Sequence, residues 1–250
     1  MRVLFLSANK LGLEVLKELR KALRISAIVT LSPNSKTVMY DGVDVSEWHG
    51  LGAQVYLIKE ISDEVQLFKK LNPELVLMCG WRQIVPEEIL RIPTKGFYGF
   101  HPTLLPEGRG PAPLINSIML NLKESGVTMF KVSNGIDDGD IVGQEKFIIE
   151  KDDYVGDVYK KATEATIKLI KYYLYRIKDN KIQTKKQGES KSKRFPKRKL
   201  LDNKINIDED PMDVIYRKIR ALSHPYKGAY IEKDGKRLVI WDAELQEIEE

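Results

Sequence analysis

Short apolar runs alternate with segments of helical periodicity along the first 80 residues, and this alternation constrains the fold more than any other feature. Segments 12–23 and 62–71 carry apolar residues at helical spacing, and the second opens on Ser62, a candidate N-cap. The apolar runs cover 2–8, 25–31, 53–58 and 74–80. Nearly continuous apolar strands separated by helices are typical of a parallel sheet covered on both faces. The sequence therefore predicts an α/β fold with a Rossmann-like, mostly parallel sheet.

The rest of the chain continues this pattern and ends in a smaller unit. The spacing predicts a helix over 113–123, strands over 126–132 and 141–149, and a long helix over 153–177. After a basic stretch, it predicts one more helix and a hairpin that turns at "KDGK". We expect a main domain over 1–180, a basic linker or loop over 181–200, and a small C-terminal helix and hairpin subdomain over 201–250.

Composition excludes several classes of protein. The chain has 250 residues, of which 42% are hydrophobic, enough for a full-sized core. The apolar run at the N-terminus is too short for a secretory signal, and no apolar stretch approaches the roughly 20 residues that span a membrane. Cys79 is the single cysteine, and its apolar surroundings predict a buried, inert thiol. We expect a cytoplasmic protein.

The positive charge is concentrated in one segment. Residues 181–200 hold nine Lys/Arg and one Glu, a local charge of +8, whereas the whole chain carries +5 and the remainder therefore −3. An anionic ligand or partner would be met by this segment and not by the whole surface. A solvated linker is the alternative interpretation of the same residues.

One histidine follows an apparent strand end. In "YGFHPTLLPEGRGPAP" (98–113), His101 precedes a loop rich in proline and glycine, and the stretch "GWRQIVPEE" (80–88) also follows a strand directly. Ligands of open α/β sheets bind at the carboxyl ends of the strands. Histidine can serve as an acid, a base or a metal ligand, although a lone histidine is often structural.

A second polar loop carries three carboxylates. "NGIDDGDIV" (134–142) places Asp137, Asp138 and Asp140 beside two glycines between predicted strands. The spacing does not match the calcium-binding EF-hand loop. Zinc would need histidine or cysteine ligands, and the other two histidines, at 49 and 224, are remote in sequence. We therefore expect no metal, and the loop is either a turn or a catalytic loop.

Three stretches together resemble the folate-dependent formyltransferases: "GWRQIVPEEIL" (80–90), "HPTLLPEGRGPAPL" (101–114) and "ESGVTMFKVSNGIDDGDIV" (124–142). This family includes methionyl-tRNA formyltransferase, glycinamide ribonucleotide transformylase and the sugar N-formyltransferases. The resemblance covers most of 1–178, and the pairing of His101 with Asp137, 36 residues later, is specific. The block 203–231 resembles the segment that follows the catalytic domain in the tRNA and sugar enzymes.

The resemblance implies transfer of a formyl group from the co-substrate 10-formyltetrahydrofolate to an amine. The attacking amine generates an oxyanion and must lose a proton. By the family pattern, His101 is the donor and proton carrier, and Asp137 orients the imidazole and favours its charged form. The same pattern assigns folate binding to Trp81, Arg82, Gln83, Ile84, Val85, Leu105 and Asp140, and acceptor binding to Tyr98, Thr103, Arg109 and Gly110.

The sequence departs from the family at one position. The family has an asparagine two residues before the histidine, and this chain has Gly99. Loss of one oxyanion donor typically costs about a hundredfold to a thousandfold in turnover. Three explanations are open: a substitute donor such as Asn116, Tyr98 or a backbone amide; a slow enzyme or one that uses another one-carbon acyl donor; or a protein that is not an enzyme.

The expected acceptor is an amino-sugar nucleotide. In the family, methionyl-tRNA formyltransferase continues into a full β-barrel, whereas about twenty residues follow the matched block here. A few cations of the basic segment could grip the pyrophosphate of a sugar nucleotide. The alternatives are a methionyl-tRNA formyltransferase-like enzyme and a non-catalytic homologue that binds an anion or nucleic acid. We expect no membrane partner, and a homodimer is compatible with the sequence.

Overall fold

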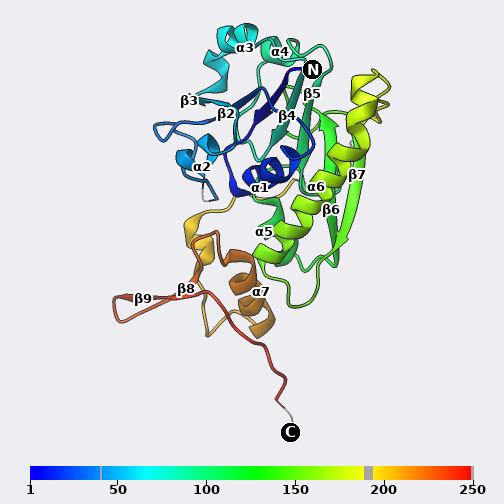
Figure 1. Ribbon diagram of the computed structural model, residues 1–250. Coiled ribbons are helices and arrows are strands. Elements are labelled where there is room, and N and C mark those ends of the chain that lie inside the picture. Colours follow the sequence, from blue (N-terminus) through cyan, green and yellow to red (C-terminus); the bar gives the residue numbers. More distant parts are fainter. Residues whose placement is uncertain (40, 189–193, 249–250) are drawn as a thin grey trace.

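The computed structural model describes residues 1–39, 41–188 and 194–248, and its centre is a seven-stranded sheet (Figure 1). The strand order is β3-β2-β1-β4-β5-β6-β7. The first five of these are parallel, and β6 and β7 are antiparallel to their neighbours. The bounds are β1 (Val3–Leu6), β2 (Ala27–Leu31), β3 (Gln54–Ile58), β4 (Leu75–Cys79), β5 (Phe97–His101), β6 (Glu124–Lys131) and β7 (Ile141–Ile148). The predicted α/β class is confirmed.

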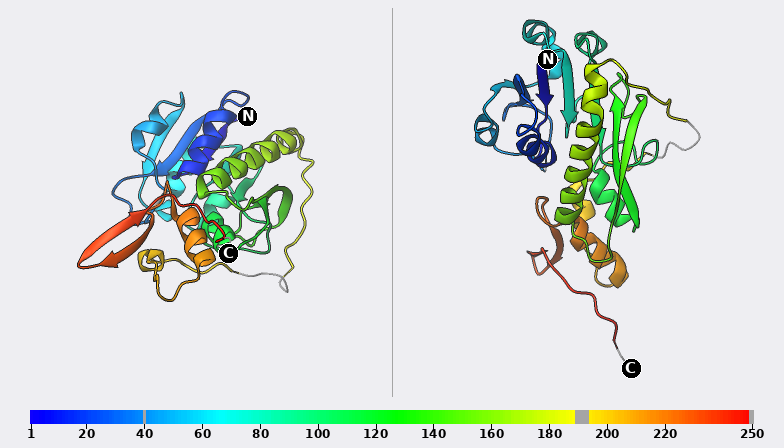
Figure 2. Two further views of the ribbon diagram at one scale, coloured as in Figure 1. Left: turned by 90° about the horizontal axis from the view of Figure 1, so that it is seen from below. Right: turned by 45° about the vertical axis from the view of Figure 1, so that its right-hand side comes forward.

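Helices cover both faces of the sheet, and each face has its own apolar core (Figure 2). The larger core takes side chains from α1 (Lys10–Leu19), α2 (Val45–His49), α5 (Pro113–Met119), α6 (Val155–Lys178) and α7 (Met212–Leu222). The smaller core takes them from η1 (Ile61–Asp63), α3 (Val65–Leu71) and α4 (Glu87–Leu90). Burial on both faces explains why the strand sequences are apolar without alternation.

Strand β5 shows how side-chain alternation sets up one edge of the sheet. Phe97 packs into the smaller core, whereas Tyr98 and Phe100 pack into the larger one. Because successive side chains of a strand point to opposite faces, Gly99 and His101 lie on the face of Phe97. His101 is the last residue of the strand, at the carboxyl edge of the parallel part.

Two predictions of helix ends were wrong. Ser62 does not cap a helix: it lies in η1, and α3 begins at Val65 without a side-chain cap. The backbone N–H of Ile61 donates instead to the side chain of Gln83, a tertiary contact that no local pattern reveals. The helix expected over 113–123 ends at Met119, because Asn121 adopts a left-handed φ of 55°.

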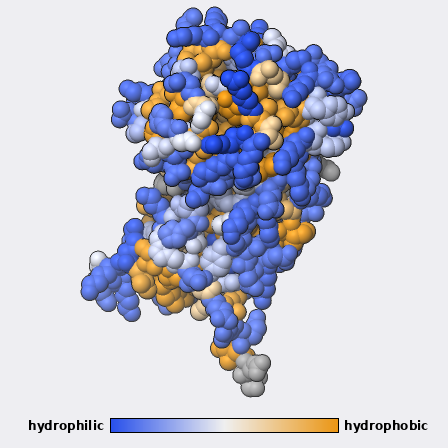
Figure 3. All heavy atoms as spheres, in the orientation of Figure 1, coloured by the Kyte–Doolittle hydropathy of each residue, from blue (hydrophilic) through white to orange (hydrophobic). Residues whose placement is uncertain are grey.

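The C-terminal residues pack beneath the sheet and include a projecting hairpin, from which an extended tail runs toward the C-terminus (Figure 1). They form η3 (Leu200–Asn203), α7 and the hairpin of β8 (Ala229–Lys233) and β9 (Lys236–Ile240). Figure 3 shows a mixed face, with hydrophobic groups over the upper part and near the hairpin. Leu238 of β9 and Trp241, just after it, have exposed side chains. Among the described residues, no helix is long and apolar enough to cross a bilayer.

The single thiol is inert, as predicted. Cys79 is fully buried in β4, and burial raises the pKa of its thiol to about 12. A thiol of that pKa is almost entirely protonated near neutral pH and is a poor nucleophile.

A buried carboxylate joins the C-terminal segment to the main sheet. Asp41 is 3% exposed, and it accepts hydrogen bonds from Arg82 at 2.9 Å, Asn9 at 2.8 Å and the hydroxyl of Tyr159 at 2.7 Å. The hydroxyl of Tyr226 lies 2.8 Å from that of Tyr159 and is free to donate to it. Burial raises the pKa of both phenols, so that they stay neutral donors.

Substitution of Asp41 should therefore destabilise the whole chain. Asp41→Ala leaves a guanidinium and a buried hydroxyl without their acceptor, and we expect the free energy of unfolding to fall by about 3 kcal/mol. Denaturant titration measures this change. Asp208→Ala, at an exposed carboxylate, is the control; an equal loss in both variants would contradict the role of the buried network.

Candidate active site

The structure brings His101 and Asp137 together at the carboxyl edge of the sheet. The imidazole is 7% exposed, and its Nε2 lies 2.8 Å from the carbonyl oxygen of Gly108. A carbonyl oxygen only accepts, so Nε2 carries a proton. Nδ1 is then the nitrogen at which a proton can be taken up or released, and it lies 3.5 Å from Oδ2 of Asp137.

The carboxylate is held by the same loop that holds the imidazole. Asp137 lies in the turn between β6 and β7 with a left-handed φ of 50°, and its Oδ2 accepts a 2.9 Å hydrogen bond from the N–H of Gly110. Gly108 and Gly110 have φ values of 74° and 96°, which glycine adopts without strain. Residues 108–110 thus contact both members of the pair.

The loop between His101 and Gly108 is anchored to the antiparallel strands. Thr128 of β6 donates to the carbonyl of Thr103 at 2.7 Å and accepts from the N–H of Leu105 at 3.0 Å. Gln144 of β7 donates to the carbonyl of Leu105 at 2.8 Å. The hydroxyl of Thr103 donates within the loop, to the carbonyl of Glu107 at 2.8 Å. The polar groups of Thr103 and Leu105 are therefore engaged in positioning the loop.

A phenyl ring occupies the space beside Gly99. Gly99 pairs with Phe130 across β5 and β6, and a Cβ at position 99 would lie 2.7 Å from Cζ of that ring. Tyr98 is 2% exposed and packs into the core on the opposite face, so the structure does not bring it to His101. The side-chain amide of Asn116 donates to the carbonyl of Pro111 at 3.0 Å.

The stretch 81–85 follows β4 and leaves its backbone unpaired. Among the described residues, the N–H and C=O groups of this stretch have no hydrogen-bond partner in the protein, and the buried indole N–H of Trp81 has none either. Ile84 is 57% exposed beside them, whereas Val85 is buried. Such a strip fits a flat heterocycle with donors and acceptors on its edge, as the pterin ring has.

Two side chains of this stretch turn away from it. The amide of Gln83 accepts from the N–H of Ile61 and donates to Thr37 and to the carbonyl of Lys59, at 2.8–2.9 Å. Arg82 pairs with the buried Asp41. Gln83 and Arg82 can therefore contribute mainly backbone groups to a ligand on the strip.

The predicted acceptor-side residues Arg109 and Gly110 have internal partners. Gly110 holds Asp137, as described above. Arg109 is 9% exposed, and its Nε and Nη2 donate to Oε1 of Gln187 at 2.9 and 2.6 Å. The main-chain carbonyl of Asp140 accepts from the N–H of Lys131 at 2.9 Å, and its carboxylate accepts from the hydroxyl of Thr184 at 3.4 Å. Sequence reasoning missed Gln187, because it lies inside a stretch whose only visible signal is charge.

The basic segment packs against the site in the parts that the structure describes. Lys185 exchanges two 2.8 Å backbone hydrogen bonds with Ile141 of β7, and the N–H of Phe195 donates to the carbonyl of Arg109 at 2.8 Å. The segment is thus partly docked, which differs from a free linker. Residues 189–193, which belong to the predicted basic stretch, lie outside the described residues.

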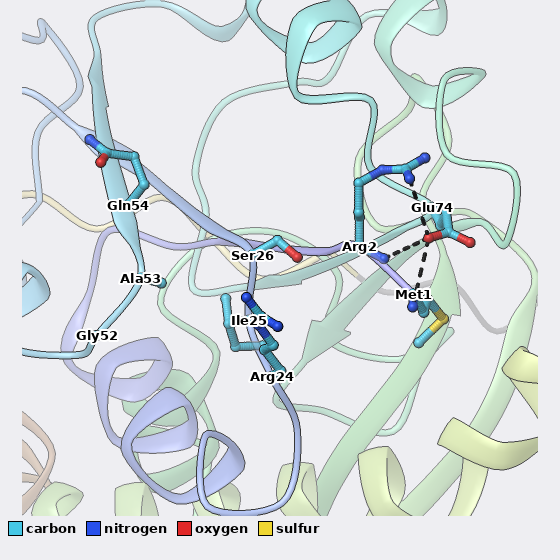
Figure 4. A pocket seen from close by; sticks show the side chains of 9 residues that line it. All are labelled: Met1, Arg2, Arg24, Ile25, Ser26, Gly52, Ala53, Gln54 and Glu74. Atoms are coloured by element: carbon cyan, nitrogen blue, oxygen red, sulfur yellow. Dashed lines mark hydrogen bonds and ion pairs between the residues drawn. The ribbon is translucent and has the colours of Figure 1, made fainter.

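A pocket lies away from this site, at the opposite edge of the sheet. It is lined by residues at the amino ends of the parallel strands, and Arg2 and Glu74 are in contact there (Figure 4). Within 1–39, 41–188 and 194–248, no three His, Cys, Asp or Glu side chains are placed to hold a metal ion. His224 stacks on Trp241, with ring centroids 4.0 Å apart.

Comparison with known proteins identifies the group to which the chain is related. The family model for "Formyl transferase" matches residues 3–173, more than half of the sequence. The chain belongs to the formyltransferase family. A second model, "Formyl transferase, C-terminal domain", matches residues 199–250. The prediction of a folate-dependent N-formyltransferase is confirmed at the level of the family, with formyl-tetrahydrofolate as the co-substrate of that family.

Relatives of this formyltransferase differ in length. A methionyl-tRNA formyltransferase of Caldanaerobacter subterraneus is 29% identical, over 99% of this chain and 82% of that protein. For five further methionyl-tRNA formyltransferases, the chain spans 59–63% of their length. The structure of a sugar N-formyltransferase from Shewanella is 25% identical, with a TM-score of 0.74 and 99% of each chain covered. HypX of Aquifex aeolicus in complex with tetrahydrofolic acid has a TM-score of 0.73 at 21% identity, over 97% of this chain and 37% of HypX.

The ring of Phe130 leads to an expected outcome for Gly99→Asn. An asparagine would overlap the ring, so we expect overpacking to lower the free energy of unfolding by about 1–3 kcal/mol and turnover not to rise. Thermal melting and initial rates measure both. A tenfold rise in turnover would show that position 99 can supply the missing donor, and would contradict this expectation. Phe130→Leu with Gly99→Asn makes room for the amide and separates overpacking from chemistry.

Proposed function

We propose that this formyltransferase moves the formyl group of 10-formyltetrahydrofolate to the amino group of an amino-sugar nucleotide. The observation that carries the proposal is the His101–Asp137 pair, which is held by one loop at the carboxyl edge of the sheet. In this proposal, residues 1–180 form the catalytic domain, 181–200 the basic segment and 201–250 a small C-terminal subdomain.

The pair can manage the proton that moves as the formyl group is transferred. The attacking amine becomes cationic as its nitrogen bonds to the formyl carbon, and the proton that it loses ends on the nitrogen of tetrahydrofolate, whose bond to the formyl carbon breaks. Nδ1 of His101 takes part in that transfer, since Nε2 is already bound to the carbonyl of Gly108. With the transferred proton on Nδ1, the imidazolium faces the carboxylate of Asp137, which stabilises it until the proton passes to the nitrogen of tetrahydrofolate.

The strip 81–85 supports the assignment of the folate site. Its unpaired backbone groups offer donors and acceptors, and Ile84 offers an apolar surface. Folate, when bound there, supplies the formyl group. The residues of the strip would bind and orient the pterin, mostly through main-chain groups.

The likeness to a sugar N-formyltransferase supports a small acceptor. The Shewanella sugar N-formyltransferase and this chain match over 99% of each. The match to methionyl-tRNA formyltransferases favours methionyl-tRNA as the second candidate acceptor. Incubation with 10-formyltetrahydrofolate and a panel of amino-sugar nucleotides, followed by mass spectrometry, tests the proposal. Formylation of charged tRNA alone would exclude it.

Removal of either member of the pair should abolish transfer and leave the fold intact. We expect His101→Ala and Asp137→Asn to reduce turnover at least about a thousandfold, because proton transfer and charge stabilisation both fail. Asparagine tolerates the left-handed φ of position 137, so the turn is kept. Turnover is measured beside a melting curve.

The neighbouring carboxylate provides a matched control. Asp138 is exposed and accepts from the hydroxyl of Ser133, a bond that asparagine can keep, so Asp138→Asn should retain near-normal turnover. Near-normal turnover in either variant of the pair would show that the assignment of His101 and Asp137 is wrong.

The exposed cations of the basic segment should act on the acceptor. We expect neutralisation of Lys185, Lys186, Arg194 and Lys197 together to raise the acceptor KM and weaken its salt dependence, with folate affinity unchanged. A few contacts to a dianion give a shallow salt slope compared with a protein that covers six or more nucleic-acid phosphates.

Four exposed lysines elsewhere on the surface serve as the control for this set: Lys36, Lys69, Lys70 and Lys233. Their neutralisation changes the net charge equally and should leave the acceptor KM unchanged. Steep salt dependence of RNA binding, with sugar formylation unaffected by the first set, would favour the tRNA acceptor.

A further inference from the structure

The side chain of Gln187 joins the two loops that carry the pair. Its Oε1 accepts from Nε and Nη2 of Arg109, at 2.9 and 2.6 Å, in the loop that holds His101. Its Nε2 donates to the carbonyls of Asp137 and Gly139, at 3.0 and 2.7 Å, in the loop that carries the carboxylate. One amide therefore makes four hydrogen bonds and bridges segments that follow different strands.

The orientation of this amide is determined by its partners. A guanidinium only donates and a carbonyl only accepts, so Oε1 must face Arg109 and Nε2 must face the 137–139 turn. The charged donors withdraw electron density from Oε1, which makes the N–H groups of the same amide stronger donors. Arg109 is 9% exposed, so these bonds form largely away from water.

The main chain on both sides of Gln187 is tied to the same two loops. On one side, Lys185 pairs with Ile141, just after the 137–139 turn. On the other side, Phe195 pairs with Arg109 and packs its ring against Gly108, where a Cβ would lie 2.8 Å from the ring. Gln187 is held between these anchors and thus reaches both loops from one position.

The relative position of the loops matters because the pair has one member on each. Gly108 and Gly110 fix the imidazole and the carboxylate oxygen, but Asp137 itself sits on a separate turn, with a left-handed φ of 50° that aspartate tolerates. Besides the Gly110 bond, the bonds of Gln187 to the carbonyls of 137 and 139, together with those to Arg109, hold this turn against the 108–110 loop.

We propose that Gln187 is a positioning residue, which sets the distance and angle between Nδ1 of His101 and Oδ2 of Asp137. It touches neither the substrate nor the pair's reacting atoms, and acts through Arg109 and the backbone of the 137–139 turn. The assignment of a catalytic consequence rests on the proposed function, whereas the clamp between the loops is a property of the free protein.

The sharpest variant is Gln187→Glu, which preserves size and shape. One carboxylate oxygen still accepts from Arg109, but the other faces two carbonyl oxygens that it can only repel, so the turn loses its tie. We expect kcat to fall about tenfold to a hundredfold, since a displacement of about 1 Å can cost that much, with both KM values within about twofold of the wild type. Gln183→Glu makes the same charge change at an exposed glutamine of the same segment and should keep wild-type kcat.

Hydrogen exchange gives a readout that needs no activity. The N–H of Gly110 donates to Asp137, so its exchange in free Gln187→Glu protein should be about tenfold faster or more, while amides in the strands β1 and β4 keep their protection. Gln187→Leu, which removes both halves of the clamp without adding charge, should accelerate the same amide.

The outcomes separate the two proposals. Unchanged exchange at Gly110 together with wild-type kcat in folded Gln187→Glu protein would overturn the positioning role. Faster exchange throughout the protein with a lower Tm would overturn it too, because Gln187 would then be a general structural residue. If the wild type formylates no acceptor, the proposed function fails, and local exchange at Gly110 still decides whether Gln187 clamps the loops.

Discussion

The three residues from Gly108 to Gly110 hold the site together through two hydrogen bonds. The carbonyl of Gly108 accepts from Nε2 of His101, and the N–H of Gly110 donates to the carboxylate of Asp137. Because the first bond occupies Nε2, the proton chemistry is confined to Nδ1, which faces Asp137. Gly108 and Gly110 both have positive φ, which directs the carbonyl of Gly108 to the imidazole and the N–H of Gly110 to the carboxylate. Glycine adopts positive φ without strain, which accounts for it at both positions.

Packing and chemistry are coupled at the neighbouring strand position. Phe130 extends across Gly99 and occupies the space that a side chain at position 99 would need. Apolar packing therefore excludes a larger residue at this position. Of the substitute donors considered from the sequence, Tyr98 lies on the opposite face and the amide of Asn116 is engaged by Pro111. His101 is no substitute, because Nε2 is bound to the carbonyl of Gly108 and Nδ1 takes up the amine proton. The second N–H of Asn116 and the backbone amides are the donors left to the oxyanion in the proposed reaction.

The parallel sheet and its cover of helices could be predicted because each element carries its own pattern. The apolar runs of β1, β2 and β4 need burial on both faces, and a helix-covered parallel sheet provides it. The start of α3 could not be predicted from local residues, since Gln83, more than twenty residues after Ile61, accepts from the N–H of Ile61 and holds the short helix η1 ahead of α3. The docking of the basic segment could not be predicted either. The charge pattern identifies its exposed residues, whereas the segment is docked by Gln187 and Phe195, which are uncharged.

The sequence by itself determined the α/β class, the inert thiol, and the two loops that carry His101 and Asp137. Periodicity, the apolar residues around Cys79 and the spacing of the motifs are all properties of the sequence. Only the tertiary structure decided that Nδ1 faces the carboxylate, that Phe130 fills the space beside Gly99, and that Gln187 bridges the loops. These facts depend on contacts between residues 27 to 78 positions apart, and such contacts form only when the strands are placed side by side. Local patterns constrain the conformation of each segment, whereas hydrogen bonds between distant loops depend on how the sheet brings them together.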